Sequence, residues 1–213
     1  MLALYSSGLR TVVGTVPVAF FCALTALRPG LKSFDWTIAA RQAASASQPS
    51  DGRLITPSSM GSVRLNMTLD AVRQLLPTAS FERGSDGDGA ALVRVRFGQG
   101  DSLVLWADED DPDAPIDWSR QIITIYTFSE TFHTIEGVRP GTPVVDAVRV
   151  FGPVREVVVS EIESRQFITF ERQPSWLTFR LDYTGIFPPG ARATTQVQPG
   201  AKLVAIYISS RWQ

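Results

Sequence analysis

The chain has 213 residues, of which 44% are apolar and 19% charged, and its formal net charge is −1. These values are typical of a globular protein with one or two domains. Because the first 50 residues are net basic, the remainder is acidic and lacks the basic face that nucleic-acid binding requires. The single cysteine, Cys22, excludes an intrachain disulfide.

An uncharged apolar run extends from Thr11 to Leu27, directly after Arg10. This pattern predicts that residues 1–30 are a signal peptide or a membrane anchor. At about 1.5 Å per residue, a helix over this run is close to the lower limit for crossing a bilayer. A cleaved signal, with Ala44-Ser45-Ala46 as a small-residue cleavage site, and a retained anchor both place the protein in the cell envelope, exported to the periplasm or anchored through residues 11–27. A buried core helix is the third alternative.

Residues 31–53 have the composition of a linker, with a stretch rich in alanine, serine and glutamine before Asp51-Gly52. Such a segment lacks the apolar periodicity of a helix or strand and predicts a flexible connection. We therefore expect the folded part of the chain to begin near Leu54.

Residues 61–77 and 137–153 are two copies of one pattern, 76 positions apart. The block Asp70–Arg73 recurs as Asp146–Arg149, and both copies end in proline. An internal repeat of this kind indicates the duplication of a supersecondary unit. It predicts a first repeat over residues 54–129 and a second over residues 130–213.

The first copy predicts a helix over Leu69–Leu76. Thr68 is a suitable N-cap, and Asp70 in the first turn complements the helix dipole. The apolar residues at helical spacing are Leu69, Val72, Leu75 and Leu76. Pro77 ends the helix.

The second copy predicts a helix with Thr142 as N-cap and Pro143 at the first helical position. Its apolar face is formed by Val145, Val148 and Phe151, together with Val144. Gly152-Pro153 is a C-terminal stop.

Segments rich in β-branched and aromatic residues follow each helix and predict antiparallel strands with one covered and one wetter face. The predicted strands are Leu92–Phe97, Ser102–Trp106, Gln121–Phe128, Glu156–Val159, Phe167–Phe170, Trp176–Asp182 and Leu203–Ile208. The expected fold is α+β: a tandem repeat of a short helix and an antiparallel sheet of three to four strands, preceded by the N-terminal hydrophobic helix.

The start of each repeat resembles the phrase that opens the repeats of β-lactamase inhibitory proteins and of small outer-membrane lipoproteins of the SmpA/OmlA type. The matching residues are Asn66–Val72 in the first copy, and Gly141–Val148 with Phe151–Pro153 in the second. Asn66 stands where the phrase has glycine. The resemblance implies an exported, non-enzymatic protein that binds another protein through a sheet face and loops.

No pattern of catalytic or metal-binding residues stands out. His133 is the single histidine, so zinc sites and Cys–His dyads within one chain are excluded, and no phosphate-binding glycine loop is present. Two acidic loops, 108–117 and 86–89, are interpreted as a solvated loop and a hairpin turn, although a calcium ion is conceivable in the first. We therefore predict that the protein is not an enzyme and has no cofactor or metal.

The expected function is protein–protein binding in the envelope, as an assembly factor or inhibitor-like binder, with a partner at a membrane. The alternative is a structural or accessory subunit of a membrane complex, in which residues 11–27 remain as a transmembrane helix. The aromatic residues near strands, Trp106, Trp118, Trp176 and Tyr126, are interpreted as core. The predicted contacts with the partner are Ile186, Phe187, Pro188, Pro189, Asp110, Asp111 and Trp118.

Overall fold

The computed structural model describes residues 52–98, 100–161 and 164–212. The predicted signal or anchor at residues 1–30, and almost all of the predicted linker at residues 31–53, lie outside the described residues. Within the described ranges, neither helix is long and apolar enough to cross a membrane.

The described part of the chain begins with a small three-stranded sheet. Its strands follow one another in the order β1 (Ile55–Thr56), β2 (Ser59–Met60) and β3 (Val63–Arg64), and all pair antiparallel. Ile55, Met60 and Val63 are buried and join the main core. This small sheet was not predicted from the sequence.

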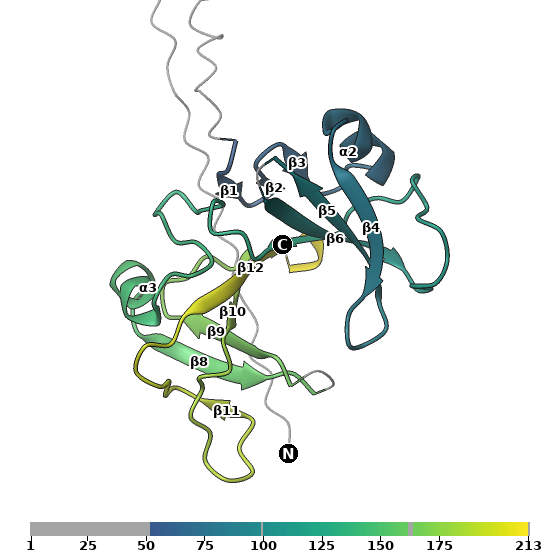
Figure 1. The fold of residues 1–213 in the computed structure, drawn as a ribbon. Helices are drawn as coiled ribbons and strands as arrows, with labels where there is room; N and C mark the ends of the chain where they lie inside the picture. Colours follow the sequence, from purple (N-terminus) through teal and green to yellow (C-terminus); the bar gives the residue numbers. More distant parts are fainter. Residues whose placement is uncertain (1–51, 99, 162–163, 213) are drawn as a thin grey trace, which may run out of the picture. The chain divides into compact units, whose positions relative to one another are not determined.

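The remaining strands form one antiparallel sheet of nine strands, in the order β11-β8-β9-β10-β12-β7-β6-β5-β4 (Figure 1). Their bounds are β4 Ser80–Ser85, β5 Ala91–Phe97, β6 Asp101–Glu109, β7 Thr124–Thr127, β8 Val154–Val159, β9 Gln166–Phe170, β10 Leu177–Leu181, β11 Ala193–Thr194 and β12 Leu203–Ser209. The final strands of the two repeats, β7 and β12, are neighbours, and Tyr126 lies opposite Tyr207 in their register.

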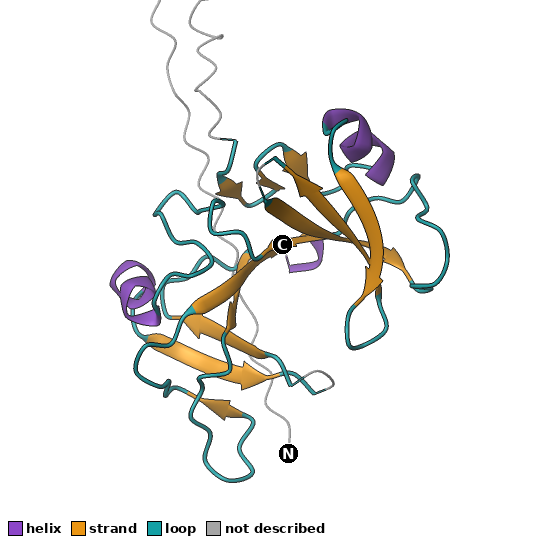
Figure 2. Ribbon diagram, in the orientation of Figure 1, coloured by secondary structure: helices purple, strands orange, loops and turns teal. Residues whose placement is uncertain are grey.

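The expected fold class is wrong. Strands dominate the described residues, in which only α2 and α3 are α-helices, and the two meanders are one continuous sheet rather than two small ones (Figure 2). The physical reason is that each meander, as a separate sheet, would end in an edge strand with unpaired backbone groups. Unpaired backbone groups along the last strand of each repeat are satisfied when β7 pairs with β12.

The order of elements nevertheless repeats along the chain. Helix α2 (Leu69–Leu75) is followed by β4, β5, β6 and β7, and helix α3 (Val144–Phe151) by β8, β9, β10 and, after the short β11, β12. The internal pattern in the sequence therefore corresponds to a helix and the four strands that follow it.

The start of α2 matches the prediction, because the Thr68 hydroxyl accepts a hydrogen bond from the Ala71 N–H at 3.2 Å. The predicted cap of α3 is wrong by one residue: Pro143 occupies the N-cap position, and the Thr142 hydroxyl accepts instead from the Arg139 N–H at 2.9 Å. A backbone contact takes over part of the role of a side-chain cap, because the Val144 N–H at the start of the helix donates to the Ala201 carbonyl at 2.9 Å.

The predicted apolar faces of the helices are partly wrong. Leu69 and Val72 of α2 are buried, but Leu75 is exposed. In α3, Val145 is 59% exposed, and Ala147 is buried in its place. Successive side chains of a helix point about 100° apart. An error of one position in the predicted apolar face is therefore enough to place an exposed valine on the buried side.

The residues before the two helices share a backbone conformation. Asn66 and Gly141 have φ of 65° and 89°, the left-handed region that glycine adopts without cost and asparagine adopts more readily than most residues. Asn66 can therefore stand where the motif has glycine. A Cβ at Gly141 would come within 2.8 Å of the Glu130 carboxylate.

The main core lies between the helices and one face of the large sheet. Both helices contribute to this single cluster, and an aromatic group of Phe151, Phe170 and Phe179 lies beneath α3. A second, smaller cluster occupies the opposite face of the sheet, and consists of Leu92, Val104, Tyr126, Ala205 and Tyr207, with Trp106 and Phe167 packed against it.

Candidate functional site: an aromatic groove

The second face of the sheet contains a cavity of about 530 Å³, within the range that ligand sites occupy in proteins. We call it the aromatic groove. It is lined by Asp86, Asp88, Ala90, Leu92, Trp106, Thr124, Tyr126, Arg165, Phe167, Thr178 and Tyr207. Both repeats contribute, the first through β5, β6 and β7 and the second through β9, β10 and β12.

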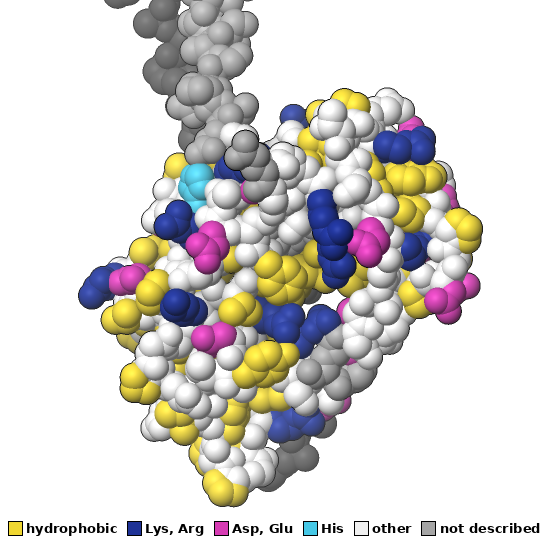
Figure 3. Space-filling model, in the orientation of Figure 1, with side chains coloured by type: hydrophobic (Ala, Val, Ile, Leu, Met, Phe, Trp, Pro, Cys, Tyr) yellow, Lys and Arg dark blue, Asp and Glu magenta, His cyan; other side chains and the backbone are white. Residues whose placement is uncertain are grey.

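The alternation of side chains along the central strands places aromatic rings on the floor of the groove. Tyr126 and Tyr207 are direct cross-strand partners, and their rings stack with centroids 4.4 Å apart and planes 17° from parallel. Phe167 contacts Tyr207 edge to face at 5.8 Å. In the space-filling view, hydrophobic and basic side chains gather beside a hollow in the centre of the molecule (Figure 3).

One wall of the groove is the turn between β4 and β5. The Asp86 carboxylate accepts hydrogen bonds from the backbone N–H groups of Asp88 and Ala90, at 3.1 and 2.8 Å. This arrangement is an Asx turn, which fixes the hairpin tip. The predicted hairpin turn at residues 86–89 is therefore confirmed, and its carboxylates line a groove.

Arg180 lies on the same face, on β10, with Phe167 and Ala205 as its neighbours in the register. Its guanidinium lies 5.8 Å from the centre of the Phe128 ring and 5.6 Å from that of Tyr183, and it donates to the Tyr183 hydroxyl at 2.8 Å. Partial burial opposes its charge, but the hydroxyls of Tyr207 and Tyr183 outweigh this effect and raise the pKa of Arg180. Phe128 and Tyr183 are 45% and 52% exposed.

A second arginine contacts Trp106, one of the residues that line the groove. Arg211 lies over the Trp106 ring, 4.5 Å from its centroid, and pairs with Asp108 at 2.5 Å. The indole N–H of Trp106 is buried and has no acceptor among the described residues. Because this N–H is buried, Trp106 offers the groove no accessible indole donor.

Burial raises the pKa of the Tyr126 hydroxyl, and neighbouring Tyr207 adds to the shift. An unfolded tyrosine has a pKa of about 10. Because the folded-state value is higher, this contribution to stability is complete below about pH 10 and is lost as the pH rises towards the folded-state pKa.

We expect Tyr126→Phe to reduce the alkaline loss of stability. Between about pH 8 and pH 11, the free energy of unfolding of the parent should fall by about 1 kcal/mol more than that of the variant. Urea unfolding at both pH values measures this difference. Tyr183→Phe, which replaces an exposed tyrosine, is the control and should lose stability as the parent does; equal losses in all three proteins would contradict the expectation.

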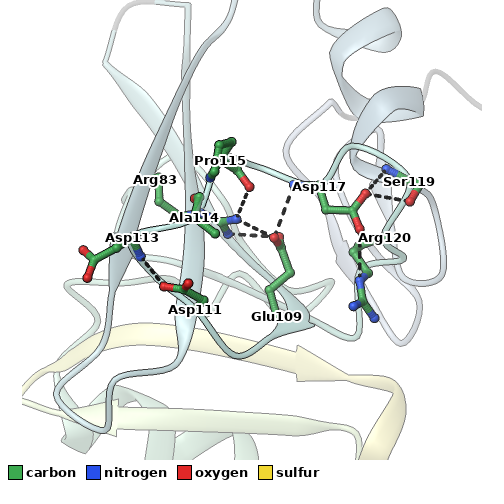
Figure 4. Close-up of polar contacts among 9 residues, drawn as sticks. All are labelled: Arg83, Glu109, Asp111, Asp113, Ala114, Pro115, Asp117, Ser119 and Arg120. Carbon is green, nitrogen blue, oxygen red and sulfur yellow. Dashed lines mark hydrogen bonds and ion pairs between the residues drawn. The ribbon is translucent and has the colours of Figure 1, made fainter.

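The acidic loop between β6 and β7 is organised around one ion pair. Arg83 on β4 pairs with Glu109 and donates to the backbone carbonyls of Ala114 and Pro115, at 3.0 and 2.9 Å. Glu109 also accepts from the Asp117 N–H at 3.2 Å. These contacts hold the loop against β4 (Figure 4).

The carboxylates of this loop bind different partners and do not converge on one point. Asp111 accepts from the Asp113 N–H, whereas Asp117 accepts from the hydroxyl and N–H of Ser119 and pairs with Arg120. The Ser119 hydroxyl, then its N–H, lowers the pKa of Asp117. In Figure 4, Asp111 and Asp113 lie on one side of the Arg83–Glu109 pair and Asp117 on the other. Among the described residues, no three acidic, histidine or cysteine side chains form a group that could hold a metal ion.

The predicted contact residues lie outside the groove. Ile186, Pro188 and Pro189 are exposed, whereas Phe187 packs against the main core.

In the acidic loop, Asp110 and Asp111 are exposed. Trp118 packs edge to face on Phe81 at 5.4 Å, with Arg73 over its ring at 4.3 Å.

The two predicted contact loops are not brought together. The acidic loop is bonded to β4, at one edge of the sheet, and the loop that contains Ile186 carries β11, at the other edge. The structure instead gathers residues that were not selected from the sequence, namely Phe167, Arg180 and Tyr207. Alternation in residues 177–182 places Arg180 on the wetter face, but Tyr207 lies in an unbroken apolar run that has no such signal.

No family model and no curated protein matches this chain. One solved structure that it resembles is that of the uncharacterized protein YfeY from Escherichia coli. The two share 14% sequence identity with a TM-score of 0.45, over 74% of this chain and 94% of that one. The resemblance to β-lactamase inhibitory proteins and SmpA/OmlA-type lipoproteins stays a prediction.

Proposed function

We propose that this chain is a non-catalytic binding protein of the cell envelope, which holds a partner protein against the open face of its large sheet. The observation that supports the proposal is the aromatic face, which we define as the aromatic groove together with Phe128, Arg180 and Tyr183. Helices cover the opposite face of the sheet, so this face is the one available to a partner.

The composition of the aromatic face favours protein recognition. Tyrosine, tryptophan and arginine are the residues that most often dominate the energy of protein interfaces. Phe128 and Tyr183 are large and exposed, and Trp106, Tyr126 and Tyr207 provide a floor on paired strands. A surface built on a sheet loses little conformational entropy on binding, which favours affinity.

The lining of the groove supports a binding role over a catalytic one. Its ionisable side chains are Asp86, Asp88, Arg165 and two tyrosines, and it contains no histidine or cysteine. His133 lies elsewhere, in a bridge to Leu54 before the small sheet. General acid–base catalysis needs a group that titrates near the working pH and reaches the substrate.

We infer the envelope location from the apolar run at residues 11–27. For the same reason, we propose that the partner is at a membrane. We propose that this run exports or tethers the protein. If it is retained as a transmembrane helix, the same binding face would serve an accessory subunit of a membrane complex, so both versions depend on the aromatic face.

A photoreactive phenylalanine analogue tests this proposal in the cells that make the protein. Introduced in place of Phe128 or Tyr183 in the full chain, it should give a discrete protein adduct on irradiation. The matched control is Val145, which is somewhat more exposed than either residue but lies on α3, on the other side of the sheet. We expect no adduct at this position.

Equal labelling at the three positions, or no adduct at Phe128 and Tyr183, would contradict the proposed function. Fractionation of the same cells tests the location. We expect the protein and its adduct with the membranes or the released envelope contents, and recovery in the cytosol would contradict an envelope protein.

A further inference from the structure

Arg180 is a half-buried cation for which no described residue supplies a counter-ion. Arg53 is partly buried and Arg83 is largely buried, and they pair with Asp101 and Glu109, respectively. Among the described residues, no carboxylate lies within ion-pair distance of Arg180, and its Nε–H is buried without an acceptor. At Arg180, a hydroxyl and two aromatic rings, rather than a carboxylate, offset the partial loss of water, so the guanidinium keeps its charge and can still pair with an anion.

The surroundings of Arg180 fix its orientation without using all its donors. A guanidinium has five N–H donors in a planar fork. One hydrogen bond goes to the Tyr183 hydroxyl at 2.8 Å. The rings of Phe128 and Tyr183 flank the group. The remaining donors suit a carboxylate, which arginine recognises through two parallel hydrogen bonds.

The groove continues from Arg180 along the same face. Thr178, two residues before Arg180 on β10, lines the cavity, as does Phe167, the register partner of Arg180 on β9. A group bound at the guanidinium therefore lies next to an apolar cavity with an aromatic floor. Side chains beside a bound carboxylate would be apolar or aromatic for the same reason.

We propose that Arg180 receives the carboxylate of an acidic residue in an extended segment of the partner protein, whose neighbouring apolar side chains lie on Phe128 and Tyr183 and in the aromatic groove. This inference rests on the proposed function. It specifies the chemistry of the partner, a single acidic residue between apolar ones.

Charge at the opposite wall distinguishes this partner from other anions. Asp86, Asp88 and Arg165 line the groove, and because two carboxylates outnumber one guanidinium, this lining is net negative and would repel a second negative charge. A polyanion, such as nucleic acid or an anionic membrane surface, presents many negative charges to both walls. One carboxylate with apolar neighbours satisfies Arg180 and leaves the acidic wall in water.

Three tripeptides of equal length test the inference: acetyl-Leu-Glu-Phe-amide, acetyl-Leu-Gln-Phe-amide and acetyl-Leu-Lys-Phe-amide. Each is titrated into the full chain, held in detergent micelles and labelled with nitrogen-15 at arginine, while NMR follows the guanidinium signals. The glutamate peptide should bind at least about tenfold more tightly than the glutamine peptide, because hydrogen bonds to charged groups are the stronger ones. The Arg180 signal should shift with the glutamate peptide.

Variants assign the preference to one residue. Arg180→Gln should abolish the preference for glutamate over glutamine, and Arg180→Lys, which keeps the charge and guards against a folding defect, should retain part of it. The matched control is Arg94→Gln. Arg94 lies on the same face, on β5, but is exposed and near Glu82, so its loss should leave the preference unchanged.

Equal affinity for the three peptides, no shift of the Arg180 signal, or a preference that survives Arg180→Gln would overturn the inference. Tighter binding of the lysine peptide would also overturn it, because Asp86 and Asp88 would then direct recognition. These failures can be distinguished from a failure of the proposed function. If a protein adduct forms at Phe128 but the protein shows no preference for the glutamate peptide, the proposed binding face is retained and only the recognition of a carboxylate is rejected.

Discussion

Phe179→Ala should lower the free energy of unfolding by about 3–5 kcal/mol. Phe179 is fully buried on β10 and contacts both Phe151 of α3 and Phe170 of β9, at 5.5 and 5.9 Å between ring centroids. Its removal leaves a cavity between the helix and the sheet of the second repeat. Because a typical domain is stable by about 5–15 kcal/mol, this one change removes a large part of the total.

Urea unfolding of the full chain measures the effect, and Phe128→Ala is the matched control. The two substitutions remove the same atoms from opposite faces of the sheet, and Phe128 is 45% exposed. The control should lose much less stability, because little cavity is created at the surface. Similar losses for the two variants would show that the main core does not lie on the helix side of the sheet.

Glu109→Leu should cost about 3 kcal/mol or more, because it leaves the Arg83 guanidinium buried and unpaired. The side chains of Arg83 and Glu109 are 14% and 9% exposed. Glu109 also accepts from the Asp117 N–H, so the same change releases the loop after β6. We expect faster amide hydrogen exchange over this loop as well as lower stability.

The double variant Arg83→Met/Glu109→Leu separates the cost of an unpaired charge from that of lost packing. It should recover much of the stability that Glu109→Leu loses, since apolar residues often replace a buried ion pair at little cost. Exchange in the loop should remain fast, because Arg83 no longer holds the carbonyls of Ala114 and Pro115. A double variant as unstable as the single one would contradict a penalty from the unpaired charge.

Local features of the fold could be predicted from the sequence where one short segment determines them. The Thr68 cap depends on residues three positions apart, and the strands after each helix follow from alternation along each strand. Strand β4 was missed because residues 80–85, Ser-Phe-Glu-Arg-Gly-Ser, contain no β-branched residue. Its pairing with β5 compensates for its low intrinsic preference for strand.

The joining of the two sheets and the groove itself could not be predicted, because both depend on contacts between distant segments. Tyr126 and Tyr207 each occur in apolar runs that predict core positions. Only the register of β7 with β12 brings their rings together. Arg180 was expected on the wetter face, but its missing counter-ion becomes visible only when its neighbours are known. A single sequence carries no signal for a charge that is left unpaired.

The pairing of β7 with β12 also determines when the aromatic groove forms during synthesis and folding. As the chain is synthesised, the first repeat emerges with the edge of β7 open, and the groove has half of its floor. Closing the long loop between these strands is entropically costly, and such distant pairings form late in folding. The groove would therefore bind a partner only after β12 has paired with β7. A partner would then bind only fully folded molecules.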